Sequence, residues 1–234
     1  MESINFQQKN FSEILPKLRE NSELIILDFN QIPPETPDYA NIKLFFEKSI
    51  KEGINPRLPE NRQAFNNLLL QKSGKKYLIG RYLENRKEIL KGSNIEKEGR
   101  TIHLGIDIFS KNLETIYSPL DGEIVRTGKE YGVYSYGNYV IMKHNLNGQI
   151  FYIFYGHLSD NLPKLGKIFE GDKIAVFGDF PDENGGWSRH VHFQILTELP
   201  KEETPIGYTS QENLEKNKIR FPNPNLILNY SNII

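Results

Sequence analysis

Two histidines at alternate positions are the clearest candidates for chemistry in this chain. The segment SRHVHFQI contains His190 and His192, with Val191, Phe193 and Ile195 filling the positions between and after them. Alternate side chains of a β-strand point to the same face, so this pattern predicts both imidazoles on one face and the apolar residues in a core. The chain has five histidines and no cysteine, so any metal site must use His, Asp and Glu ligands.

The segment IHLGIDIF has the same alternation. On a single strand, His103, Gly105 and Asp107 would face one way and the apolar residues between them the other. His103, Asp107 and one histidine of the HVH pair would supply two imidazole nitrogens and a carboxylate oxygen, a set that suits catalytic zinc with a fourth position for water. Bound zinc lowers the pKa of such a water to roughly 7. The residues therefore predict an amide hydrolase with one Zn²⁺ per chain and no side-chain nucleophile.

Three further positions bear on the hypothesis of a zinc site. Gly105 indicates either a close approach, here by a metal and its substrate, or a β-bulge, and both interpretations stay open. His157, in IFYGHLSD, follows an aromatic strand and would orient the water or stabilise a developing oxyanion. His144, in YVIMKHN, either lines the same site or caps a hairpin, and the sequence does not decide between them.

Three further residues are candidates for substrate contact. Trp187 and Arg189 come just before the HVH segment. The guanidinium of Arg189 would either bind a carboxylate or phosphate through two parallel hydrogen bonds or lie exposed in a loop. Tyr136, in YGVYSYGNY, belongs either to a substrate-contact loop or to a hairpin with cross-strand aromatic pairs, and the hairpin is favoured. The chain contains no HExxH, P-loop or GxSxG motif.

The segments that must position these residues are short, and from about residue 76 they are rich in β-branched and aromatic residues. They are KKYLIGRYLE, IHLGIDIF, GEIVRTG, NYVIMKH, QIFYIFYGHL, KIAVFGD and HVHFQIL. The dipeptides Asp121-Gly122, Asn147-Gly148 and Gly185-Gly186 fit turn positions that need positive φ. The pattern predicts a mainly β fold, with an antiparallel β-sheet domain over residues 76–234 that includes a C-terminal tail.

Residues 1–75 have a different character and predict a mixed, mostly helical N-terminal extension. FSEILPKLRE, PDYANIKLFFEKSIKEG and ENRQAFNNLLLQKSG carry apolar residues near helical spacing, and ELIILDF is strand-like. We find no catalytic motif in this part of the chain. It is expected to pack on or extend the main domain.

Composition argues against two classes of partner. The 234 residues include 29 Lys and Arg against 30 Asp and Glu, so no overall positive field attracts nucleic acid or an anionic membrane. No run of about 18 apolar residues and no signal-peptide pattern occur, so we expect a cytoplasmic protein, or a periplasmic or secreted one if the sequence is trimmed. The oligomeric state is not indicated.

Three segments in order, HLGID, YGHLS and HVHF, resemble the H-x-x-x-D, Y-x-H-L and H-x-H signatures of the lysostaphin-type zinc metallopeptidases, or peptidoglycan (glycyl-glycine) endopeptidases. The resemblance covers roughly residues 99–198, the core of the predicted domain. It implies zinc held by His103, Asp107 and His192, with His157 and His190 as catalytic histidines. It also implies a cleft-bearing antiparallel sheet, a bacterial source and a peptide or muropeptide-like substrate.

A narrower resemblance changes the expected substrate. The segments YLIGRYLENR, RTIHLGIDIF, ENGGW and PNPNLIL are similar to a peptidase-like module fused to kinase-like phosphotransferase and class III aminotransferase domains in some large bacterial proteins. If that module is the nearer relative, peptidoglycan is not implied as the substrate.

Two other functions stay open. The first is a catalytically silent peptide- or glycan-binding module with structural zinc or none. Blocking of the cleft by residues 1–75 would have the same outcome. The second is an iron(II) facial triad for oxygen chemistry. The H-x-x-x-D spacing and the lack of a recognisable cosubstrate anchor disfavour iron.

Overall fold

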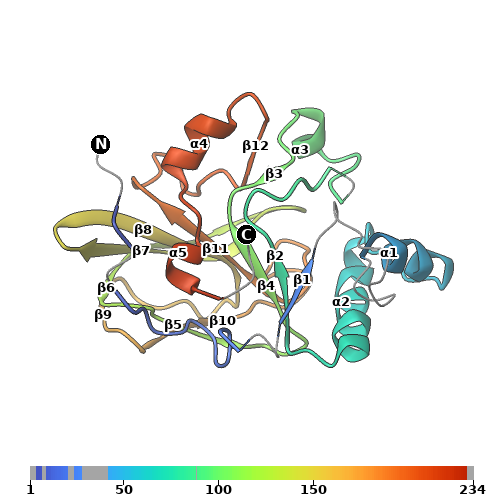
Figure 1. The fold of residues 1–234 in the computed structure, drawn as a ribbon, viewed down its shortest axis with the longest axis horizontal. Helices are drawn as coiled ribbons and strands as arrows, with labels where there is room; N and C mark the ends of the chain where they lie inside the picture. The colour runs from blue at the N-terminus through green and yellow to red at the C-terminus, as the bar shows by residue number, and fades with distance from the viewer. Residues whose placement is uncertain (1–3, 7–8, 21–23, 28–41, 88, 231–234) are drawn as a thin grey trace.

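The centre of the fold is one eight-stranded sheet with strand order β1-β2-β4-β11-β8-β7-β6-β9 (Figure 1). The computed structural model describes residues 4–6, 9–20, 24–27, 42–87 and 89–230. All neighbouring strands are antiparallel except β1 and β2. The prediction of a mainly β, antiparallel fold is confirmed. The strands of this sheet are β1 (Leu24–Leu27), β2 (Tyr77–Gly80), β4 (Ile106–Phe109), β6 (Gly122–Glu130), β7 (Gly137–Leu146), β8 (Gln149–Leu158), β9 (Gly166–Ile168) and β11 (His190–Leu196).

The remaining elements surround this sheet. Two small two-stranded sheets pair β10 (Lys173–Val176) with β5 (Thr115–Tyr117) and β12 (Tyr208–Thr209) with β3 (Ile102–His103). The helices are α1 (Ile42–Lys51), α2 (Pro59–Ser73), α3 (Asn94–Lys97), α4 (Leu214–Arg220) and α5 (Asn225–Leu228). In Figure 1, α1 and α2 lie beside the end of the sheet formed by β1 and β2. Within the described residues, no helix is both long and apolar enough to span a membrane.

Strand β11 alternates as its sequence predicts. Val191, Phe193 and Ile195 are fully buried in the main hydrophobic core. His190 and His192 alternate with them on the opposite face of the strand, and they too are buried. The central sheet therefore has an apolar core on one face and a buried polar site on the other.

The segment IHLGIDIF is not the single strand that its alternation predicts. It is divided into β3 and β4, which pair with different partners, and the chain bends between them at Leu104 and Gly105. Leu104 packs in a separate apolar cluster with Tyr139 and Phe154, whereas Ile106 packs in the main core. The break allows His103 and Asp107 to approach each other from two sheets.

The N-terminal residues contribute to the same main core. Phe11, Ile14, Leu15 and Leu18 are buried in it. The predicted helix at FSEILPKLRE is wrong, because the chain forms turns there and Lys17 has φ 66°. Proline at position 16 is unfavourable inside a helix, and burial of the apolar side chains decides the local structure instead.

Helices α1 and α2 form as predicted and pack on one edge of the sheet. Phe46 of α1 packs with Phe65 and Leu69 of α2, and this cluster covers Leu78 of β2. Residues 28–41, which include the start of the predicted PDYANIKLFFEKSIKEG helix, lie outside the described residues. Together with the parallel pairing of β1 and β2, this packing attaches the N-terminal segment to the sheet.

The predicted turn residues have two different roles. Asn147 and Gly148, with φ 52° and 85°, join β7 to β8, and Gly185 and Gly186, with φ 69° and 79°, precede β11. The prediction for Gly122 is wrong, because this residue begins β6 without a positive φ. The C-terminal tail includes α5 and packs into the core, and residues 231–234 lie outside the described part of the chain.

Candidate metal centre

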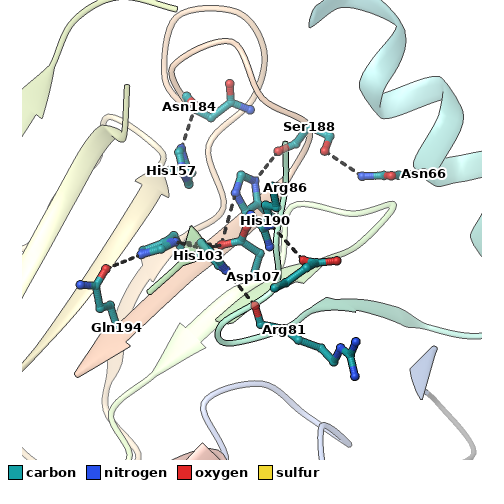
Figure 2. A network of polar contacts seen from close by, with 12 residues as sticks. Asn66, Arg81, Arg86, His103, Asp107, His157, Asn184, Ser188, His190 and Gln194 are labelled. Atoms are coloured by element: carbon teal, nitrogen blue, oxygen red, sulfur yellow. Dashed lines mark hydrogen bonds and ion pairs between the residues drawn. The ribbon is translucent and has the colours of Figure 1, made fainter. Parts of the chain in front are cut away.

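Three potential metal-ligand atoms converge on one face of the sheet. His103 comes from β3, Asp107 from β4 and His192 from β11, where it pairs directly with Asp107. His103 Nε2 lies 3.0 Å from His192 Nδ1, and Asp107 Oδ1 lies 2.9 Å from His192 Nδ1 and 3.4 Å from His103 Nε2. These residues form a buried group with ligand atoms within 4.8 Å of one another. Figure 2 shows His103 and Asp107 of this group lying close together.

The outer nitrogens of both histidines have hydrogen-bond acceptors. His103 Nδ1 lies 3.0 Å from the carbonyl oxygen of Arg81, and His192 Nε2 lies 2.8 Å from Gln194 Oε1. If each outer nitrogen carries the proton and donates it, His103 Nε2 and His192 Nδ1 both face inward with lone pairs. Two lone pairs facing each other at 3.0 Å repel, and a cation between them removes that repulsion. The donor set therefore fits a metal ion.

The other oxygen of Asp107 contacts a buried ion pair. Arg86 Nη1 donates a short hydrogen bond to Asp107 Oδ2, and Arg86 Nε donates to Glu84 Oε2 at 2.9 Å. Burial alone would raise the pKa of Asp107, but His103 and Arg86 outweigh burial and hold this pKa well below its ordinary value. Asp107 is therefore a carboxylate at neutral pH, as a metal ligand must be.

His157 and His190 lie together beside the three ligand atoms. Their rings stack with centroids 4.1 Å apart. Their Nδ1 atoms lie 2.9 and 2.7 Å from the carbonyl oxygens of Asn184 and Ser188, respectively, so an Nδ1 proton would be donated there and each Nε2 left as an acceptor. His190 Nε2 lies 3.9 Å from Asp107 Oδ1.

Burial keeps both of these histidines neutral. It lowers the pKa of His190 to about 4 and holds the pKa of His157 well below its ordinary value. His157 also has φ 63°, a left-handed conformation that is costly for a residue other than glycine. Both imidazoles are therefore unprotonated at Nε2 at neutral pH, the form that a general base requires.

A cavity of about 400 Å³ opens beside these groups. Asp107, His157, His190 and His192 line it, together with an aromatic wall formed by Tyr134, Tyr136, Trp187 and Tyr208. The hydroxyl oxygen of Tyr136 is buried and has no hydrogen-bond partner among the described residues. An unsatisfied buried hydroxyl is costly, so this group is suited to receive a polar atom of a bound molecule.

The structure brings together seven of the eight predicted site residues, and Arg189 is the exception. Its guanidinium is paired with Asp179 at 3.0 Å and donates to the Lys111 carbonyl at 2.7 Å, and it does not line the cavity. His144 also lies elsewhere, stacked on Phe151 with Nδ1 3.0 Å from the Asp121 carbonyl oxygen. Of the two interpretations of His144, the one that places it at the site is therefore not supported.

Helix α2 holds the loop that leads into β11. Arg62 donates to the Gly186 carbonyl at 2.9 Å and its guanidinium lies 4.4 Å from the centre of the Trp187 ring. Asn66 donates to Ser188 Oγ at 2.8 Å, and Gln63 accepts from the backbone N–H of Arg189 at 2.6 Å. Helix α2 thus supports one wall of the cavity.

Sequence reasoning missed the residues that support the ligands. The pattern that identified His190 and His192 also places Gln194 on the same face of β11, so it could have been found. Glu84 and Arg86 carry no comparable signal, because Arg86 contacts Asp107, and Glu84 contacts Arg86, only in the tertiary structure, where residues 83–86 are hydrogen-bonded to the segment that carries His103.

Residues 101–206 match Peptidase family M23. The resemblance to lysostaphin-type metallopeptidases is confirmed by this match. No curated protein matches the chain.

Several solved structures are similar over part of the chain. A zinc-containing peptidase from Vibrio cholerae is 29% identical, with a TM-score of 0.35, over 41% of this chain and 27% of that one. The solution structure of lysostaphin is 24% identical, with a TM-score of 0.35, over 49% of this chain and 43% of that one. The catalytic domain of lysostaphin from Staphylococcus simulans is 23% identical, with a TM-score of 0.37, over 50% and 80%. This chain covers less than half the length of the Vibrio cholerae peptidase and of the lysostaphin solution structure.

Proposed function

We propose that this protein is a zinc-dependent hydrolase that cleaves a peptide bond, with His103, Asp107 and His192 as zinc ligands. The observation that carries the proposal is the inward-facing donor set: two imidazole nitrogens and one carboxylate oxygen with their outer atoms already hydrogen-bonded. Three protein ligands leave a coordination position open, as catalytic zinc sites require. The match of residues 101–206 to a peptidase family supports the same reaction class.

Zinc in this position would supply Lewis acidity, activating a water molecule and polarising the scissile carbonyl. The proton released from water has two acceptors of suitable type, His190 Nε2 and His157 Nε2. Both rings are buried and held by Nδ1 contacts to backbone carbonyls, so their orientation is set before substrate arrives. One imidazole would take the proton, and it would later be returned to the leaving amine.

The aromatic wall would position the substrate. Tyr136 places an unpartnered hydroxyl beside His157 and His192, where it can donate to the carbonyl oxygen as negative charge develops on it. Trp187 offers an apolar surface next to His157 and His190. Substrate binding by Arg189 would require its ion pair with Asp179 to open, so we assign the polar contact to Tyr136 instead.

We propose a peptide of the muropeptide type as the substrate class, because residues 101–206 match Peptidase family M23, whose members act on peptidoglycan peptides. The test is incubation of the zinc-loaded protein with glycine-rich peptides and with soluble muropeptides, followed by mass spectrometry of the products. Cleavage that stops with chelator and returns with zinc supports the proposal. A fully zinc-loaded protein that cleaves none of these peptides contradicts it.

A further inference from the structure

We infer that Arg86 is a positioning residue of the metal centre, which restricts Asp107 to offering a single oxygen to the metal and so keeps the centre at low coordination number. This inference rests on the proposed function. It concerns a residue that lies behind the ligand and does not line the cavity beside it.

The two oxygens of Asp107 face different partners. Oδ1 lies among the histidines, 2.9 Å from His192 Nδ1 and 3.4 Å from His103 Nε2. Oδ2 accepts the hydrogen bond from Arg86 Nη1 on the opposite side. A carboxylate that gives one oxygen to a guanidinium has the other free for a metal, so Asp107 is prepared to bind in the monodentate mode.

Arg86 is itself held in place from several directions. Glu84 Oε2 accepts from Arg86 Nε at 2.9 Å, and the hydroxyl of Tyr208 lies 3.4 Å from Nη1. Gly80, which pairs with Asp107 across β2 and β4, leaves room for the guanidinium, since a Cβ at that position would lie 2.4 Å from Arg86 Nη2. The planar guanidinium of Arg86 therefore occupies the space that the missing side chain at Gly80 leaves in the sheet.

The same segment is tied to another ligand. The backbone N–H of His103 donates to the Glu84 carbonyl at 3.0 Å, and the N–H of Leu83 donates to the His103 carbonyl at 2.8 Å. The N–H of Arg86 donates to the Thr101 carbonyl at 2.8 Å. Residues 83–86 are therefore fixed to the strand that carries His103, and Arg86 connects that strand to Asp107.

Burial makes this arrangement sensitive to substitution. The side chains of Glu84, Arg86 and Asp107 are only 1%, 6% and 4% exposed. Water cannot readily replace Arg86 at Oδ2, and without the guanidinium both carboxylate oxygens become available to the metal. A second oxygen ligand favours the higher coordination numbers typical of manganese or magnesium over the four-coordinate geometry of zinc.

The test compares Arg86→Met, Arg86→Lys and Arg19→Met, the last as a control for loss of an arginine that donates to backbone carbonyls of the C-terminal tail, away from the metal centre. Three quantities are measured: zinc affinity by competition with a chromophoric chelator, the visible absorption of the cobalt-substituted protein, and the thermal midpoint of the metal-free protein. We expect Arg86→Met to weaken zinc binding by roughly 10- to 100-fold and to reduce the intense cobalt bands of a low-coordinate site. Lysine should restore part of the affinity, and Arg19→Met should leave affinity and spectrum unchanged.

If Arg86→Met does not fold, Glu84→Gln provides the test, because this variant keeps Arg86 and weakens only the contact that anchors it. We expect this variant to show the same spectral change with a smaller loss of affinity. The inference is overturned if folded Arg86→Met keeps wild-type zinc affinity and an unchanged cobalt spectrum. If Arg86→Met does not fold, the same result in Glu84→Gln overturns it. Either result would leave the proposed hydrolase intact. A wild-type protein that binds no zinc would contradict the proposed function itself.

Discussion

The ring of His192 occupies the space that any side chain at position 105 would need. A Cβ added to Gly105 would lie 2.4 Å from His192 Cε1 and 2.6 Å from its Nε2. The close approach that a strand glycine indicates is therefore made by a candidate ligand itself. Gly105 also lies at the break between β3 and β4, so one residue both separates the strands and makes room for the ring.

This relationship predicts the effect of Gly105→Ala. The methyl group must displace His192 or the backbone of Phe193, whose carbonyl oxygen would lie 3.0 Å from it. We expect zinc affinity to fall by roughly tenfold or more, a loss of the size caused by disturbing the support of a ligand. The chelator-competition assay measures it. Gly148→Ala, at a hairpin where an added Cβ meets nothing within 4 Å, is the control, and equal zinc affinity in all three proteins would contradict the prediction.

Gln194 is expected to set the tautomer of His192. Replacing it with leucine removes the acceptor at 2.8 Å from His192 Nε2 and should weaken zinc binding by roughly 10- to 100-fold. Gln194→Glu keeps an acceptor of the same shape and should preserve most of the affinity. If leucine and glutamate at this position bind zinc equally well, the contact to His192 has no part in metal binding.

His157 and His190 are expected to act on protons without holding the metal. His157→Gln and His190→Gln should each lower kcat for peptide cleavage by roughly 10²- to 10⁴-fold while zinc content stays at the wild-type level. His144→Gln, a change at a buried histidine away from the cavity, serves as the control and should leave kcat unaffected. Loss of zinc from the His190 variant would instead make His190 a ligand.

The sequence could predict the site better than the supports around it. Alternation along β11 places His190 and His192 correctly, because a strand repeat needs only local information. The same reasoning applied to IHLGIDIF wrongly predicts one strand, since the break at Gly105 depends on the approach of a ring from 87 positions further along the chain. The pairing of Arg86 with Asp107 likewise depends on tertiary structure, and no local sequence pattern predicts it.

Protonation of His144 should contribute to acid sensitivity of the fold. Burial lowers its pKa from 6.5 to about 4, so between these values the unfolded chain binds more protons than the folded one. The free energy of unfolding must then fall as pH is lowered from 6.5 toward 4, and the contribution of this residue over that window is roughly 2 to 3 kcal/mol.

Urea unfolding of the metal-free protein at pH 7 and pH 4 measures this effect. His144→Gln keeps a donor for the Asp121 carbonyl and should lose less stability across the window than wild type. The other buried histidines are present in both proteins, so their contributions cancel in the difference. Identical losses in the two proteins would show that His144 does not titrate in this range.

The most direct test of the metal centre is the zinc content of the purified protein and of His192→Ala, measured by plasma mass spectrometry after both have been offered zinc and dialysed. The inward-facing nitrogens of His103 and His192 and the oxygen of Asp107 predict close to one zinc per wild-type chain and a large loss in the variant. Wild-type protein that stays free of zinc, or a variant that retains it fully, would contradict the site and the hydrolase built on it.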